Sequence, residues 1–346
     1  MPVHNALPHL DAAIKSILDQ TFTDFEFVIL DDASTDGSRE RLDQWVRRDA
    51  RIRLLSVEKN LGPVGSSNLV ARAARAFFVA RMDADDISYP DRFATEIELL
   101  REHPTAGIVA GLCDMIDTSG KKMRDAEIWR LARRSVFVPF AHGAMMYRRD
   151  VFEQVGGYRE ECEFWEDQDL VIRMGRISDI WVIPRPVYRV RQSTTSTRVG
   201  SSQERLEQAL DREYRAIDRL VRGEAYDVRL PNSEHERKNL DPRVFIAIGS
   251  VRLWAGCEPR LFRRFLARAD ISFNVRTASA LIWTAWASLS PSTLRWFLLV
   301  LLRARNRLTS KRLLPQTAAF AWQPLEQARG IENEAATPAG LAGPSS

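Results

Sequence analysis

The chain has 346 residues, of which 45% are hydrophobic and 28% charged, so it can bury the core of one large domain or two smaller ones. The net charge of +4 comes mostly from Arg and suits a phosphate-bearing ligand or an anionic membrane surface, but no basic block is interleaved with aromatic residues, which argues against a nucleic-acid partner. Three widely spaced cysteines indicate neither a disulfide framework nor a zinc site, and residues 1–5 lack the features of a signal peptide, so we expect a cytoplasmic protein.

Helix-like and strand-like segments alternate over about the first 120 residues. Helical spacing of apolar residues predicts helices over residues 8–19, 39–48, 65–75 and 90–102. Apolar runs predict strands over residues 25–30, 52–57, 76–82 and from 107 onward. This alternation predicts an α/β fold with a mostly parallel central sheet flanked by helices on both faces.

The chain changes character near residue 200. Residues 1–200 are expected to form the α/β domain, and residues 201–330 to form an α-helical C-terminal region. Within that region, two apolar runs over 278–302 are each too short to span a membrane, and basic residues follow them. They suit a helical hairpin at the membrane interface, or alternatively a helical subdomain that packs on itself or on a second copy. Residues 331–346 are rich in Ala, Pro, Gly and Ser and are expected to be disordered.

A cluster of carboxylates follows the apolar residues 76–80. Asp83, Asp85 and Asp86 come within four residues, so they are expected at the C-terminal edge of that strand. Ligands bind at this edge in open α/β sheets. Clustered carboxylates repel one another unless a cation compensates, and Mg²⁺ usually takes one or two carboxylates together with substrate phosphates. The run therefore indicates a metal–diphosphate site, or alternatively an acidic turn that caps the helix near Pro90.

A second acidic pair, Asp31 and Asp32, ends the strand predicted over 25–30 and is expected at the same edge. A carboxylate in this place can accept hydrogen bonds from a ribose or from a base N–H. Alternatively, the two acids cap the helix that follows Ser34, because Asp and Ser are ordinary cap residues.

Five sequence motifs resemble, in order and spacing, those of the inverting family 2 glycosyltransferases with the GT-A fold. They are residues 1–5 with 16–22, residues 25–38, residues 60–62, residues 80–92 and residues 164–170. The resemblance covers about residues 1–195 and implies a Rossmann-like GT-A catalytic domain.

The resemblance also implies which residues bind the donor nucleotide. Pro2 and Val3 would lie beside the nucleobase. Asp32, or Asp31 next to it, would bind the base or ribose, and Asp83 would contact the ribose.

The same resemblance assigns the reacting groups. Asp85 would hold Mg²⁺ or Mn²⁺ on the diphosphate, and Asp167, in the Glu166–Asp167 pair, would be the general base. The chemistry agrees, because a metal-bound diphosphate is a better leaving group and an acceptor hydroxyl needs a base to take its proton. One base opposite the leaving group predicts inversion. Alternatively, Glu166 and Asp167 are the acidic first turn of a helix running to Met174, which does not exclude catalysis.

Two further positions stay open. His142 contacts donor phosphate or acceptor, or it is a buried His with one satisfied nitrogen. Arg191 stands where many family members carry a His near the phosphates, so it either pairs with the diphosphate through its bidentate fork or is a surface Arg at a strand end. Family members also carry more apolar residues before the Pro2–Val3 pair, so we expect the natural start to lie upstream of Met1.

These features predict an inverting, hexosyltransferase-like glycosyltransferase that needs Mg²⁺ or Mn²⁺. It would move a sugar from a nucleotide-diphosphate donor, a UDP-sugar, to a saccharide or lipid-linked acceptor in bacterial cell-surface polysaccharide synthesis, with the inner membrane surface as a further partner. One alternative is a nucleotidyltransferase, although no Gly-rich phosphate loop follows the first strand. The other is a non-catalytic sugar-nucleotide-binding subunit, against which the presence of Asp85 and Asp167 speaks.

Overall fold

The structure is a computed structural model that describes residues 1–124, 140–191 and 322–324. Apart from residues 322–324, the predicted helical region over 201–330 lies outside the described residues, as do its interfacial segment 278–302 and the predicted tail over 331–346. None of the described helices is long and apolar enough to cross a membrane.

The N-terminal sheet has three parallel strands in the order β1-β2-β3. All of β2 is buried, which is the pattern of a central strand covered on both faces. Helices α1 and α2 connect the three strands as in βαβ units. The elements are β1 (Pro2–Val3), α1 (Leu7–Leu18), β2 (Phe27–Asp32), α2 (Ser38–Val46) and β3 (Ile52–Val57).

The second sheet has seven strands and is mixed, with the order β10-β9-β6-β8-β4. β9 runs parallel to β6 and β10, whereas β8 is antiparallel to both β6 and β4. β5 pairs with β9, and β7 with β6, both antiparallel. The strands are β4 (Phe78–Ala80), β5 (Ile87–Ser88), β6 (Ala106–Ile116), β7 (Lys122–Arg124), β8 (Met145–Arg148), β9 (Asp179–Arg191) and β10 (Trp322–Pro324).

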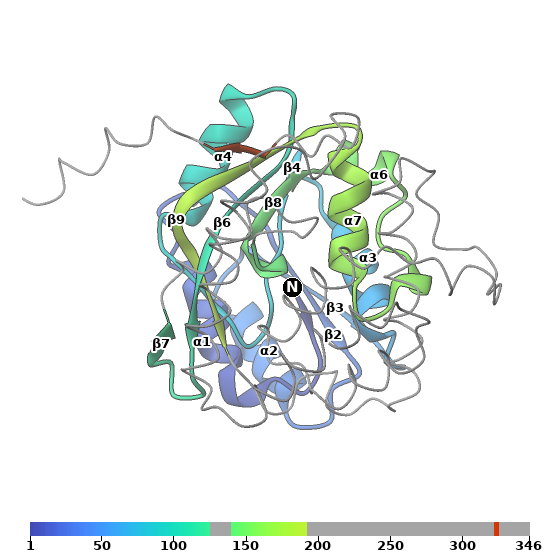
Figure 1. The fold of residues 1–346 in the computed structure, drawn as a ribbon. Helices are drawn as coiled ribbons and strands as arrows, with labels where there is room; N and C mark the ends of the chain where they lie inside the picture. The colour runs from blue at the N-terminus through green and yellow to red at the C-terminus, as the bar shows by residue number, and fades with distance from the viewer. Residues whose placement is uncertain (125–139, 192–321, 325–346) are drawn as a thin grey trace, which may run out of the picture.

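Helices cover both faces of the second sheet (Figure 1). Val109 and Cys113 of β6 pack into a core cluster that includes residues of α4, whereas Ile108 and Ala110 pack into another that includes residues of α7. The remaining bounds are α3 (Gly62–Ala73), α4 (Arg92–Glu102), the 3-10 helix η2 (His142–Ala144), α6 (Arg149–Gln154), the 3-10 helix η3 (Glu160–Cys162) and α7 (Glu166–Gly175).

The structure confirms the α/β fold but corrects one strand. The strand predicted over 76–82 extends only over Phe78–Ala80 and is half-buried. Phe77 is 83% exposed, because strand pairing with β8 begins at Phe78 and leaves the Phe77 side chain outside the sheet. The prediction of a mostly parallel sheet holds throughout the first sheet, while the second also contains antiparallel pairs.

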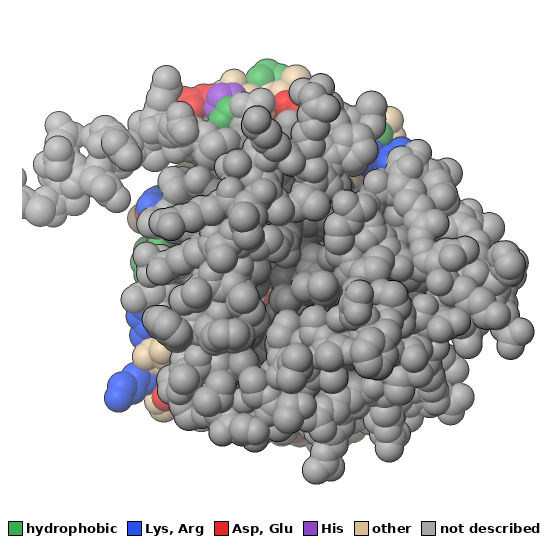
Figure 2. Space-filling model, in the orientation of Figure 1, with side chains coloured by type: hydrophobic (Ala, Val, Ile, Leu, Met, Phe, Trp, Pro, Cys, Tyr) green, Lys and Arg blue, Asp and Glu red, His purple; other side chains and the backbone are tan. Residues whose placement is uncertain are grey.

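Where described residues reach the visible surface, acidic side chains lie mainly at the top edge and Lys and Arg side chains mainly at the left edge (Figure 2). Among the described residues, Lys15 with Asp19 and Arg185 with Asp91 form exposed ion pairs. Exposed pairs of this kind contribute little to stability. The ion pairs that matter for the structure are therefore the buried ones described below.

Candidate active site

The acidic segment, residues 81–86, connects β4 to β5 and carries the three predicted carboxylates. Burial raises the pKa of Asp83, but the charge and hydrogen bond of its ion-pair partner Arg81, with smaller contributions from His142 and the N-terminal amine, together lower it by more, so the pKa lies below its ordinary value. Burial, and then the charge of Asp83, raise the pKa of Asp85 to about 6. Asp86 is 4% exposed, and its Oδ1 accepts the backbone N–H of Arg191 at 2.7 Å. Burial and the two neighbouring carboxylates raise the pKa of Asp86 well above its ordinary value.

Asp83 pairs with a described cation, whereas Asp85 and Asp86 form no ion pair with the described residues. Burial first, and then the charge of Asp83, raise the pKa of Asp85, because both disfavour its charged form. Within residues 1–124 and 140–191, no group of three or more His, Cys, Asp or Glu side chains is arranged to hold a metal ion. Mg²⁺ needs no such group when phosphates and water complete its coordination. Asp85 therefore fits a divalent cation that arrives with a diphosphate.

Arg191 lies at the end of β9, beside the acidic segment, and is 7% exposed. Its Nε donates to the carbonyl oxygen of Asp85 at 2.7 Å, and its Nη1 to the carbonyl oxygens of Asp117 and Thr118 at 2.9 Å each. The interpretation of Arg191 as a surface residue is wrong, because these carbonyls surround its guanidinium. Nη2 makes no hydrogen bond with the described residues and remains available to an anion.

The acidic pair in the first sheet lies at the ends of β1 and β2. Asp31 and Asp32 are 4% and 2% exposed. Asp31 Oδ1 accepts the N–H of Ser34 at 3.3 Å, and Asp32 Oδ1 accepts the N–H of Leu61 at 2.7 Å. Each carboxylate thus holds a loop with one oxygen and keeps the other free of hydrogen bonds to the described residues. The residues that pair in register are Pro2 with Leu30 and Val3 with Asp31.

The two acidic clusters do not share a sheet. Asp31 and Asp32 end a strand of the first sheet, whereas the acidic segment follows a strand of the second. Among the described residues, no hydrogen bond or ion pair joins them. The expectation of one common sheet edge is therefore corrected: α1, which follows β1 and hydrogen-bonds to β5, connects the two parts.

Glu166 and Asp167 are the first two residues of α7, as the alternative interpretation of a helical first turn predicts. Trp165, which precedes them, is fully buried and anchors the start of the helix. Asp167 Oδ1 accepts the N–H of Gln168 at 2.8 Å. The candidate base is thus fixed at a helix N-terminus.

A buried arginine fixes α7 to the preceding loop. Arg173 pairs with Asp169, one turn before it, and donates to the carbonyl oxygens of Val155 and Gly157 at 2.7 Å each. Asp169 is 0% and Arg173 6% exposed. The register of α7, and with it the place of Asp167, follows from these contacts.

The charges of the acidic segment and of α7 both act on His142, which lies in η2. Its Nε2 lies 2.7 Å from the hydroxyl oxygen of Tyr158. Burial and the charge of Arg81 lower the pKa of His142 to about 3, and the charges of Asp167 and Asp83 oppose this shift. Three charged groups therefore act on one neutral imidazole. Nε2 of this half-buried His has a partner in Tyr158, while Nδ1 makes no hydrogen bond with the described residues.

Two residues of this site, Arg81 and Tyr158, were assigned no role from the sequence. Tyr158 is held by Asn68, which accepts its N–H and donates to its carbonyl oxygen, both at 2.9 Å. Arg81 had a detectable signal, because a cation directly before three acids can compensate one of them. The contact of Tyr158 with His142 becomes visible only in the fold.

Comparison with known proteins identifies the family. The glycosyl transferase family 2 model matches residues 1–156. An uncharacterized glycosyltransferase of Haemophilus influenzae is 28% identical over 236 residues, which are 61% of this chain and 70% of that protein. The putative glycosyltransferase EpsE of Bacillus subtilis is 30% identical over 180 residues, 50% of this chain and 64% of EpsE. The putative teichuronic acid biosynthesis glycosyltransferase TuaG of the same species is 33% identical over 105 residues, 30% of this chain and 42% of TuaG. The chain thus spans less than two thirds of EpsE and of TuaG.

Solved structures show the same fold. Residues 1–349 of S. aureus TarS, in complex with UDP-GlcNAc, superpose with a TM-score of 0.55 at 17% identity, covering 78% of this chain and 80% of that one. The mannosyltransferase PcManGT of Pyrobaculum calidifontis, in complex with GDP-Man and Mn²⁺, gives 0.53 at 20% identity and covers 90% and 86%. Residues 1–156 form a glycosyl transferase family 2 domain, and the described part of the chain has the GT-A fold.

Proposed function

We propose that the chain transfers a sugar from a nucleotide-diphosphate donor, a UDP-sugar, to a saccharide or lipid-linked acceptor with inversion. One observation carries the proposal: the Asp83 N–H of the acidic segment donates to Tyr188, whose hydroxyl lies against Gly143, and the charge of Asp167 at the start of α7 acts on the adjacent His142. Two separate carboxylate-bearing segments at one site supply what the reaction needs, a place for the diphosphate and a base for the acceptor. The UDP-GlcNAc bound by TarS supports a UDP-sugar as donor.

The nucleoside would lie at the end of the first sheet. Pro2 and Val3 would border the base. The second carboxylate oxygen of Asp32, or of Asp31, would accept a hydrogen bond from the base or the ribose. The carboxylate of Asp83 would also accept a hydrogen bond from a ribose hydroxyl, since Arg81 keeps it ionised.

The diphosphate would lie against the acidic segment. Asp85 would hold the cation, Mg²⁺ or Mn²⁺, and the free Nη2 of Arg191 would donate to a phosphate oxygen. A divalent cation bound there stabilises the departing diphosphate and removes the need for an acid on that side. The Mn²⁺ in PcManGT supports a metal of this kind.

Asp167 would take the proton of the acceptor hydroxyl as the new glycosidic bond forms. A base on the face opposite the diphosphate gives a single displacement and therefore inversion. Glu166 directly precedes Asp167 at the start of α7 and would be a second carboxylate beside the base.

The biological setting that we propose is cell-surface polysaccharide synthesis, which the name of TuaG supports. A lipid-linked acceptor would bring the protein to the inner face of the cell membrane as a peripheral, cytoplasmic enzyme. Segment 278–302, which lies outside the described residues, is the part of the sequence suited to that contact.

Turnover of a panel of nucleotide sugars with Mn²⁺ or Mg²⁺ tests the proposal, with released nucleoside diphosphate as the signal. We expect release from one donor that requires the metal and falls by at least about 100-fold in Asp85→Ala and in Asp167→Ala. Asp19→Ala is the control, because Asp19 forms an exposed pair with Lys15 on α1 and should keep full activity.

Two results would contradict the proposal. Release of nucleoside diphosphate from no donor would favour a non-catalytic subunit. Release of pyrophosphate from a nucleoside triphosphate and a sugar phosphate would instead identify a nucleotidyltransferase.

A further inference from the structure

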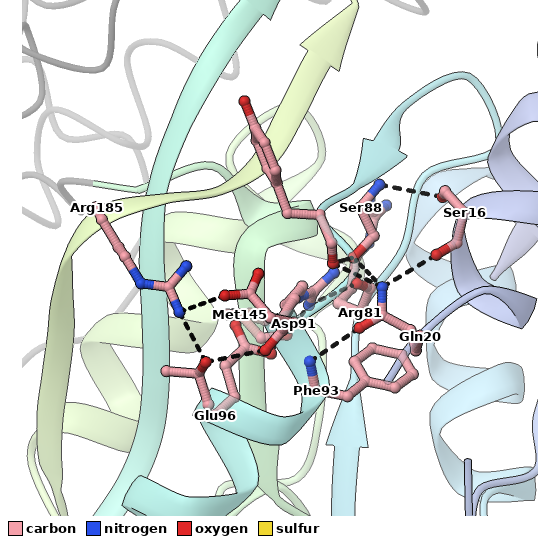
Figure 3. A network of polar contacts seen from close by, with 12 residues as sticks. Ser16, Gln20, Arg81, Ser88, Asp91, Phe93, Glu96, Met145 and Arg185 are labelled. Atoms are coloured by element: carbon pink, nitrogen blue, oxygen red, sulfur yellow. Dashed lines mark hydrogen bonds and ion pairs between the residues drawn. The ribbon is translucent and has the colours of Figure 1, made fainter. Parts of the chain in front are cut away.

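A fully buried arginine, Arg92, holds the start of the acidic segment. Arg92 is the first residue of α4, and its Nη2 donates to the carbonyl oxygens of Arg81 and Met145 at 3.0 Å each. The N–H of Arg81 donates to the same Met145 oxygen at 3.0 Å. Arg92 therefore bridges the point where the acidic segment leaves β4 and the point where β8 begins. Figure 3 shows Arg81, Met145 and Glu96 within one network of polar contacts.

Stability alone does not explain a charge in this place. Arg92 and Glu96 are both 0% exposed and pair at 3.0 Å. Two buried charges lose their hydration, and well-packed apolar residues in their place are often equally or more stable. The positive end of the helix dipole also disfavours a cation at the first position of α4. The pair is better explained by the two carbonyls that Arg92 holds.

Tyr188 holds the same segment two residues further on. Its hydroxyl oxygen accepts the N–H of Asp83 at 3.1 Å, and the guanidinium carbon of Arg92 lies 5.2 Å from the centre of its ring. The position of the Tyr188 hydroxyl requires Gly at residue 143, because a Cβ there would lie 2.3 Å from the hydroxyl oxygen. The backbone of residues 81–83 is therefore fixed at the Arg81 carbonyl and at the Asp83 N–H.

We propose that Arg92 and Tyr188 are positioning residues that fix the backbone of residues 81–83, so that Asp83 and Asp85 face the nucleotide sugar and its cation. The inference rests on the proposed function of the acidic segment. Each residue acts through the backbone, so its loss leaves every carboxylate in the sequence but lets the segment move.

Two variants of the full chain test this proposal. Tyr188→Phe removes only the hydroxyl that accepts the hydrogen bond from the Asp83 N–H. The double variant Arg92→Met/Glu96→Leu replaces the buried ion pair with apolar side chains of similar volume. In both, hydrogen exchange of peptides covering residues 81–86 should rise about fivefold or more, as expected from the loss of one hydrogen bond. The Mn²⁺ concentration needed for half-maximal UDP binding should rise by a similar factor. Arg92→Lys, which keeps a cation opposite Glu96, should recover part of the effect.

Arg185→Gln is the matched control. Arg185 pairs with Asp91 at the same end of α4 but is 42% exposed, and we expect neither exchange nor Mn²⁺ requirement to change (Figure 3). The proposal is overturned if folded Tyr188→Phe and the double variant show wild-type exchange, or if exchange rises while the Mn²⁺ requirement stays at the wild-type value. If the double variant does not fold, Tyr188→Phe decides. If the unmodified chain does not bind UDP with Mn²⁺, the proposed function fails, and the exchange measurement still decides whether the two residues hold the segment.

Discussion

Single residues in the acidic segment differ in how their charge is compensated. Asp83 pairs with Arg81, and Asp86 accepts the N–H of Arg191. Asp85 forms no ion pair with the described residues, and burial together with the charge of Asp83 raises its pKa. The sequence presents three equivalent carboxylates. It cannot rank them, because the ranking depends on where the fold places two arginines.

Binding of Mn²⁺ should depend on pH through Asp85. Burial raises the pKa of Asp85 to about 6, so below that pH a proton competes with the cation. We expect the Mn²⁺ affinity, measured with UDP present, to fall roughly tenfold per pH unit below this pKa and to level off above it. Asp85→Asn should bind weakly at every pH without this slope. An affinity of the wild-type chain that is constant from about pH 5 to about pH 8 would contradict the assignment.

Single elements were predicted from the sequence where local patterns decide them. The apolar spacing of α1 and the acidic first turn of α7 are local, and both helices form where expected. The strand over 76–82 was predicted too long, because the exposure of Phe77 is set by pairing with β8, which is far away in the sequence. Similarly, the tie between Tyr158 and His142 joins segments whose proximity no local pattern reveals.

The anchoring of α7 should depend on Arg173. Arg173→Ala removes the bonds to Val155 and Gly157 and leaves Asp169, which is 0% exposed, without its closest cation. Loss of one partner of a buried pair typically costs about 3–5 kcal/mol of unfolding free energy. Urea unfolding followed by circular dichroism measures it.

The exposed pair of Lys15 and Asp19 offers a control with the same helical spacing. Lys15→Ala should cost no more than about 0.5 kcal/mol. Equal costs for Lys15→Ala and Arg173→Ala would show that Arg173 does not anchor α7.

The whole molecule joins two sheets through the end of α1. Gln20, just past α1 and 3% exposed, donates to the carbonyl oxygen of Tyr89 at 2.7 Å and accepts the N–H of Phe93 at 3.0 Å. This contact sets the first sheet, with the residues proposed to bind the nucleoside, against the part of the second sheet that carries the acidic segment. The motifs predicted the fold class and the parallel first sheet. They did not predict that β8 lies between β6 and β4, because that order results from pairing between distant segments.

The most direct test of the account is a crystal structure of the full chain with UDP and Mn²⁺, with the metal located by its anomalous scattering. We predict Mn²⁺ at about 2.0–2.3 Å from a carboxylate oxygen of Asp85 and from the diphosphate, with the uridine against Pro2, Val3 and Asp32. Asp167 should then face the β-phosphate across the space for the sugar. Mn²⁺ and UDP bound away from the acidic segment, with Asp85 free of both, would contradict the central claim.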